Sequence, residues 1–160
     1  MVVNHPKKAR GNPASPKVIT VLMADDNDLV RGEFRKIIEL EDDFEVVGEA
    51  TNGREAVEMV EKLRPAVVLM DMAMPLLNGC QATREILKTF PATKVLILSA
   101  HRDDAYVEEA IHSGAMGYLI KQSSAETVCL AIRQIQKGHA FFSQSILDDP
   151  HKWGQKKELG

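Results

Sequence analysis

The chain has little of several residue types, and each shortage excludes a class of protein. Two of its 160 residues are cysteine, Cys80 and Cys129, and they lack the spacing of a zinc site. Both stand in apolar, helix-like segments, so we expect reduced thiols rather than a disulfide. No apolar run approaches the roughly 20 residues that span a bilayer, and no signal-peptide stretch follows the first basic residues. We therefore predict a cytoplasmic protein with no membrane partner.

Acidic side chains are missing from the start of the chain, although the net charge is −3. Residues 1–17 contain Lys7, Lys8, Arg10 and Lys17 but neither aspartate nor glutamate. Such a basic arm can touch nucleic acid, yet its mixture with proline, glycine and asparagine favours a solvated, disordered tail. The rest of the chain is correspondingly acidic, which argues against nucleic-acid binding by the folded part itself.

Short apolar runs alternate with helix-spaced segments from residue 18 onwards. The runs are rich in Val, Ile and Leu, which is typical of buried strands, and they cover residues 18–24, 44–50, 66–71, 94–100 and 117–121. Between them, apolar residues step at helical spacing, as Val30, Phe34, Ile37 and Ile38 do. Five strand–helix units in alternation predict an α/β fold, an open five-stranded parallel sheet with helices on both faces.

Residues that begin and end helices stand between these segments. Helix caps are therefore expected at Asn27 or Asp28, Asn52, Asn78 and Asp103, at Ser123 with Glu126 as a capping box, and at the carboxyl-terminal glycines Gly114 and Gly138.

Chemically competent side chains follow four of the five predicted strands. Asp25 and Asp26 follow the first strand, Asp71 ends the third, Ser99 the fourth and Lys121 the fifth. The carboxyl ends of parallel strands meet at one edge of the sheet, where ligands of such folds bind. Each residue alone has an ordinary explanation as a turn former, a cap or a solvated charge. Their conjunction at one edge predicts a shared site.

Three crowded carboxylates repel one another unless a cation lies between them. Oxygen ligands suit a hard ion such as Mg²⁺, a lysine supplies a point charge for phosphate, and a serine supplies a hydroxyl. These groups together indicate phosphoryl transfer, with Asp71 as the candidate nucleophile that forms an aspartyl phosphate.

Other phosphate and metal sites find no support in the sequence. Neither G-x-G-x-x-G nor G-x-x-x-x-G-K-[ST] occurs. The histidines have no ligand spacing; they are His5, His101, His112, His139 and His151.

Four motifs resemble the receiver domain of bacterial two-component response regulators. They are ADDN (24–27), MDMAMPLLNG (70–79), LSAH (98–101) and GYLIK (117–121), and the resemblance extends over residues 18–138. DFEVVGEATNGREAV (43–57) and HSGAMGYLIK (112–121) are most similar to the NarL-like subgroup, whose output is a LuxR-type helix-turn-helix. The resemblance implies a flavodoxin-like (CheY-like) sheet with strand order 2-1-3-4-5.

The same resemblance implies roles for the residues at the sheet edge. Asp71 matches the phospho-acceptor, and Lys121 matches the lysine that pairs with the phosphoryl group. Asp26 is expected to bind Mg²⁺ directly and Asp25 mainly through water, while Ala73 would offer its backbone carbonyl to the metal.

Two further residues match those that change conformation on phosphorylation in this family. Ser99 corresponds to the hydroxyl that turns to the phosphoryl group, and Tyr118 to the aromatic that changes rotamer with it. The altered surface would be that of the fourth helix, fifth strand and fifth helix, roughly residues 103–138. The resemblance implies a sensor histidine kinase as phosphoryl donor and is compatible with a phosphorylation-dependent homodimer. The resemblance implies no enzymatic activity beyond self-catalysed phosphotransfer and dephosphorylation.

The same residues fit two other functions less well. A Mg²⁺-dependent phosphatase of the haloacid dehalogenase type also uses an aspartate after a strand, but it requires a second acid two residues later, where this chain has Ala73. A binding module that kept the fold and lost phosphorylation is disfavoured by the intact acids, serine and lysine.

The chain is expected to divide into a basic arm (1–17), a receiver domain (18–138) and a tail or linker (139–160). Only 22 residues follow Gly138, too few for a helix-turn-helix. The chain is therefore either a receiver separated from its output domain, which we favour, or a stand-alone receiver. In the favoured case, transcriptional control and any DNA contact belong to a helix-turn-helix that is absent from this chain.

Overall fold

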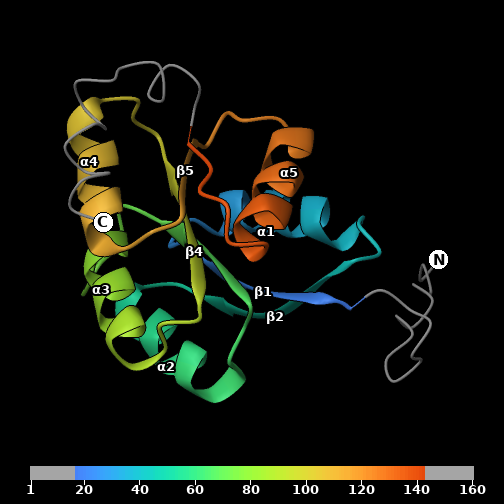
Figure 1. Ribbon diagram of the computed structural model, residues 1–160, viewed down its shortest axis with the longest axis horizontal. Helices are drawn as coiled ribbons and strands as arrows, with labels where there is room; N and C mark the ends of the chain where they lie inside the picture. Colours follow the sequence, from blue (N-terminus) through green and yellow to red (C-terminus); the bar gives the residue numbers. More distant parts are fainter. Residues whose placement is uncertain (1–16, 143–160) are drawn as a thin grey trace.

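The computed structural model describes residues 17–142; the arm and tail predicted on either side lie almost wholly outside this range. Within it, strands and helices alternate regularly (Figure 1). The elements are β1 (Ile19–Ala24), α1 (Asp28–Glu39), β2 (Phe44–Ala50), α2 (Gly53–Leu63), β3 (Val67–Asp71), α3 (Gly79–Thr89), β4 (Lys94–Ser99), α4 (Asp104–Ser113), β5 (Gly117–Ile120) and α5 (Ala125–Gln136). The predicted alternation is confirmed, and each strand end lies within one residue of its predicted position.

The strands form one parallel sheet in the order β2-β1-β3-β4-β5, as predicted. Helices α1 and α5 cover one face of the sheet, and α2, α3 and α4 cover the other (Figure 1). Since all strands run in the same direction, their carboxyl ends meet at one edge, and the residues that follow β1, β3, β4 and β5 are brought together there.

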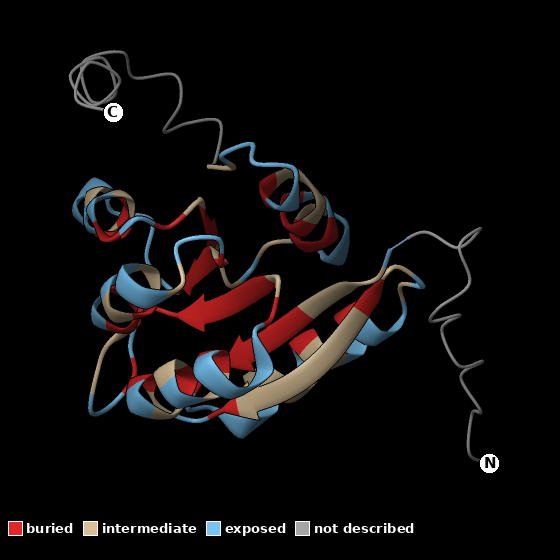
Figure 2. Cartoon of the chain, turned by 60° about the horizontal axis from the view of Figure 1, so that its bottom comes forward, coloured by how far each residue is buried: buried red, intermediate tan, exposed pale blue. Residues whose placement is uncertain are grey.

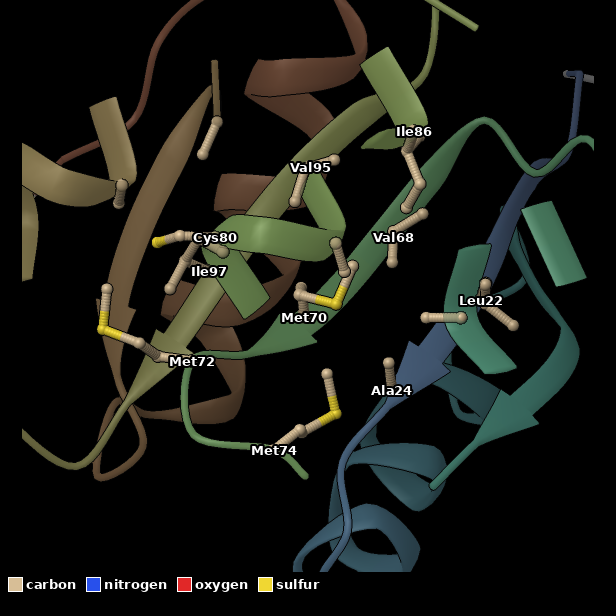
Figure 3. Close-up of a cluster of buried hydrophobic side chains, with 14 of the residues drawn as sticks. Leu22, Ala24, Val68, Met70, Met72, Met74, Cys80, Ile86, Val95 and Ile97 are labelled. Carbon is tan, nitrogen blue, oxygen red and sulfur yellow. The ribbon is translucent and has the colours of Figure 1, made fainter. Parts of the chain in front are cut away.

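A hydrophobic core fills the space on each side of the sheet. The side chains of α1 and α5 pack on one face, and those of α2, α3 and α4 pack on the other. All five residues of the central strand β3 are buried, whereas the edge strand β2 is mostly half-buried (Figure 2). Met72 and Met74 in the loop after β3 also enter the core, near Met70 and Cys80 (Figure 3). The carboxyl end of β3 is therefore held by a buried strand and a closely packed loop.

Both cysteines are buried and unpaired. Among residues 17–142, every helix falls short of the length and apolar character that a membrane crossing requires.

Asparagine side chains cap the first three helices as predicted. Asn27, Asn52 and Asn78 each accept a hydrogen bond from the first turn, and Asn78 forms a full capping box with Gln81. Asp103 stands at the start of α4 but makes no side-chain cap bond.

The capping box predicted for Ser123 and Glu126 is wrong by one residue. The hydroxyl that caps α5 belongs to Ser124, and it accepts from the N–H of Thr127 at 3.1 Å. Gly114 ends α4 with φ 98°, and Gly138 follows α5 with φ 91°, so both predicted glycines do take the left-handed conformation.

Gly79 allows the start of α3 to lie against the backbone at the end of β3. A Cβ atom at this position would lie 2.2 Å from the carbonyl oxygen of Asp71, which real structures do not tolerate. We expect Gly79→Ala to destabilise the domain by about 2–3 kcal/mol, because the β3–α3 loop must move away. Urea unfolding measures this change.

Gly32 provides the matched control, since a Cβ there meets nothing within 4 Å. Gly32→Ala should stabilise α1 by about 0.5–1 kcal/mol. Unchanged stability in Gly79→Ala would show that the close approach is not needed.

The segment after α5 adds a short parallel pairing to the edge of the sheet. Phe141 bridges to Gly117, its N–H donates to Met116, and its carbonyl accepts from the N–H of Tyr118. Phe141 packs with the core beside α5, and Phe142 with the core beside α4. The packed domain thus extends past α5, and residues 141–142 cover part of the edge of β5.

Candidate functional site

Three carboxylates meet at the carboxyl edge of the sheet. Asp25 and Asp26 follow β1, and Asp71 ends the neighbouring strand β3. One oxygen from each lies within 4.8 Å of the others. Asp25 and Asp71 are buried, while Asp26 is exposed. The sequence predicted this meeting from the geometry of a parallel sheet, and the structure brings the three acids together.

Asp71 occupies a position that disfavours its charged form. Its side chain is buried, and burial together with the nearby charge of Asp25 raises the pKa of Asp71 to about 6, although Lys121 opposes this shift. Its Oδ1 also accepts a hydrogen bond from the N–H of Ala73 at 3.3 Å. A nearby positive charge would therefore stabilise the ionised form of Asp71.

Lys121 supplies one such neighbour. Its Nζ lies 3.0 Å from Oδ2 of Asp25 and 3.1 Å from Oδ1 of Asp71. Burial lowers the pKa of Lys121, but hydrogen bonds to these two aspartates outweigh burial and leave that pKa raised. The lysine therefore carries its charge at neutral pH and bridges the acids that follow β1 and β3. One ammonium nevertheless leaves three carboxylates incompletely compensated.

The donor set fits a divalent metal ion. Three carboxylates in mutual reach supply hard oxygen ligands, and Oδ2 of Asp25 is buried with the ammonium of Lys121 as its ion-pair partner. A small, doubly charged cation such as Mg²⁺ would offset the repulsion between the acids. The structure shows the N–H of Ala73 pointing its hydrogen bond to Asp71, and a metal contact from the Ala73 carbonyl stays a prediction.

Ser99 and Tyr118 are joined through the backbone of His101. The hydroxyl of buried Ser99 accepts the N–H of His101 at 3.0 Å, and the hydroxyl of Tyr118 donates to the carbonyl of His101 at 2.6 Å. Tyr118 is itself buried, and burial raises the pKa of its phenol. The ring of His101 stacks on Tyr106 of α4, with centroids 4.7 Å apart. The end of β4 is thereby connected to both α4 and β5.

Arg31 is a further residue at this edge, and sequence reasoning did not identify it. Helical spacing indicated which face of α1 is apolar, but it gave no target for the arginine. In the structure one guanidinium nitrogen donates to the backbone carbonyl of Asp25 at 2.8 Å. The position of Arg31 one turn after the Asn27 cap was the only available signal, and it is a weak one.

Comparison with known proteins agrees with this geometry. The sequence model of the response regulator receiver domain matches residues 21–133. The chain belongs to the response regulator receiver domain family.

Individual relatives of this receiver domain point to one subgroup. The transcriptional regulatory protein DegU of Brevibacillus brevis is 39% identical over 128 residues, which cover 80% of this chain and 54% of DegU. The response regulator protein VraR of Staphylococcus aureus is 35% identical over 129 residues, 81% of this chain and 62% of VraR. The chain therefore spans little more than half the length of these relatives.

A solved structure shows the same fold. The signal receiver domain of the putative response regulator NarL from Mycobacterium tuberculosis superimposes with a TM-score of 0.74 at 33% identity, over 78% of this chain and all of that one. This protein is thus a receiver domain of two-component response regulators of the LuxR/NarL type. Membership of this family implies phosphorylation-based signalling, and the domain is a signalling domain rather than a catalytic enzyme.

Proposed function

We propose that Asp71 accepts a phosphoryl group from a phosphohistidine of a sensor histidine kinase. One observation carries the proposal: the buried carboxylate of Asp71 lies 3.1 Å from Lys121 Nζ and within 4.8 Å of carboxylate oxygens of Asp25 and Asp26. Nucleophile, cation and metal ligands are therefore assembled at one point.

In the transfer, an oxygen of Asp71 forms a bond to phosphorus while the phosphorus–nitrogen bond of the donor breaks. The electron pair of that bond stays on the imidazole nitrogen, so the kinase regains a neutral histidine after proton balance with solvent. Mg²⁺ bound by Asp25, Asp26 and Asp71, with the carbonyl of Ala73, would neutralise charge on the phosphoryl oxygens. Lys121 moves its charge from the acids to the new phosphoryl group and holds it in place.

Phosphorylation would reach the surface through Ser99. When its hydroxyl turns to the phosphoryl group, the N–H of His101 loses its acceptor, and the loop that also holds the Tyr118 hydroxyl must adjust. Tyr118 would then change rotamer, and the α4–β5–α5 surface would shift between two packings. The existing bonds through His101 support this route.

The partners follow from the same proposal. A sensor histidine kinase supplies the phosphoryl group, and the phosphorylated surface favours a homodimer. DNA would be contacted only through an output domain of the LuxR type, which residues 17–142 do not include. All of these steps would take place in the cytoplasm.

Titration with Mg²⁺ tests the metal part of this proposal. Two-dimensional NMR of the unphosphorylated protein should show saturable shifts at the carboxyl edge, and Asp26→Asn should weaken the affinity at least about tenfold, since removal of even an outer-shell partner commonly costs that much. Asp42→Asn changes an exposed acid away from the site and should leave the affinity unaltered. Binding that does not depend on Asp26 would favour a module that has lost phosphorylation.

A further inference from the structure

Arg31 of α1 has three hydrogen-bond partners at the carboxyl edge of the sheet. Its Nε donates to Oε1 of Glu49 at 2.7 Å, one terminal nitrogen donates to the carbonyl of Asp25 at 2.8 Å, and the other donates to Oδ1 of Asp28 at 2.8 Å. Its side chain is only 13% exposed. Each guanidinium nitrogen thus has a separate partner, on β2, after β1 and on α1.

The bond to Asp25 is the one that concerns the site. The carbonyl of Asp25 belongs to the peptide group that joins Asp25 to Asp26, two of the three carboxylates at the predicted metal site. The N–H of Asp25 donates to Ala50 at 3.0 Å, and its Oδ1 accepts from Asn27 at 2.8 Å. With Lys121 on Oδ2, Arg31 supplies the partner of the Asp25 carbonyl, and a bond to this oxygen restrains the planar peptide that leads to Asp26.

Glu49 explains why Arg31 remains in this place. It accepts from Nε of Arg31 and also contacts Arg35, one turn further along α1. Arg35 shares Glu49, but its other ion pair is with Glu39, and no bond to Asp25 is made by it in the described residues. Two arginines of one helix thus share one carboxylate, and only Arg31 is joined to the acidic pair.

We propose that Arg31 is a positioning residue, which holds the Asp25–Asp26 peptide so that both carboxylates face the metal site. This inference rests on the proposed function, because it assumes that the acidic pair binds Mg²⁺. The role requires the fork of the guanidinium and not merely its charge, since a lysine has one nitrogen and cannot reach Asp25 and Glu49 with the same geometry.

The test compares Arg31→Met, Arg31→Lys and Arg35→Met by Mg²⁺ titration followed by NMR. Both Arg31 variants should bind Mg²⁺ about tenfold more weakly than wild type, the loss typical of outer-shell partners. Without metal, the amide resonance of Asp26 should also shift in both. Arg35→Met, which also removes an ion pair with Glu49 but no bond to Asp25, should change neither the affinity for Mg²⁺ nor the Asp26 resonance. Circular dichroism establishes that each variant is folded. If Arg31→Met does not fold, the comparison of Arg31→Lys with wild type and Arg35→Met carries the test.

The outcomes separate the two proposals. If wild type binds Mg²⁺ and Arg31→Lys binds it equally well, charge alone suffices and the positioning role is refuted. Equal weakening by Arg35→Met would refute it too, because the shared ion-pair network would then be responsible. A wild-type protein that binds no Mg²⁺ would refute the proposed metal site, and the role of Arg31 with it.

Discussion

Replacement of Asp71 by Asn is expected to stabilise the Mg²⁺-free protein by about 2 kcal/mol at about pH 7.5. Burial, reinforced by the charge of Asp25, raises the pKa of Asp71 from 3.8 to about 6. The folded protein therefore binds this proton more tightly than the unfolded chain does. The resulting stabilisation is complete below the unfolded pKa and is lost as pH rises through about 6. Asn cannot ionise, so it avoids that loss.

The full pKa difference corresponds to about 3 kcal/mol, and the lost contact between Asp71 and Lys121 reduces the expected gain. Urea unfolding over a series of pH values measures it. The two proteins should differ least near about pH 4 and most above about pH 7, because only wild type ionises in between. Asp42→Asn should follow wild type throughout. An Asp71→Asn variant that is less stable than wild type at neutral pH would show that burial and Asp25 do not destabilise the ionised carboxylate of Asp71.

Mg²⁺ should reduce the difference in unfolding free energy between Asp71→Asn and wild type. A ligand that binds only the folded state adds stability that grows with its concentration. Wild type should gain that stability, whereas Asp71→Asn, which lacks one carboxylate of the trio, should gain less. The same acids that cost stability in the free protein are thus the ones that make it responsive to a cation.

Much of this site could be predicted from the sequence, because its positions follow from strand geometry. Val67–Asp71 is a short apolar run, so a central strand was expected, and a parallel sheet places Asp25, Asp26 and Asp71 at one edge. The asparagine caps are likewise local, since an amide oxygen at the right place satisfies the first turn whatever packs around it.

Other features depend on contacts that local patterns do not contain. Ser123 and Ser124 both precede residues able to complete a cap, and the local rule could not choose between them. Arg31 finds Asp25 and Glu49 only once β1 and β2 lie side by side. The pairing of Phe141 with Gly117 forms only in the folded protein, where the two residues approach closely. A Cβ at Gly117 would lie 2.8 Å from the Phe141 carbonyl oxygen, a contact that the sequence alone does not reveal.

The largest expected effect is loss of phosphoryl acceptance when Asp71 is changed. Among the three acids, Asp71 is the one at the end of the central buried strand, and its Oδ1 lies 3.1 Å from Lys121. Asp25 shares the contact with Lys121, but Asp25 and Asp26 both follow β1 rather than belong to a strand, so neither should substitute for Asp71. An amide at position 71 has no anionic oxygen to attack phosphorus, and its reaction should fall below detection.

Acetyl phosphate with Mg²⁺, followed by intact-mass spectrometry, tests the central claim most directly. Wild type and Asp42→Asn should each gain the mass of one phosphoryl group, peptide analysis should place it on Asp71, and Asp71→Asn should gain none. Omission of Mg²⁺ should greatly slow the reaction. A wild-type protein that forms no adduct with acetyl phosphate or any other donor, or an Asp71→Asn variant that forms it equally well, would contradict the assignment of Asp71 as phospho-acceptor.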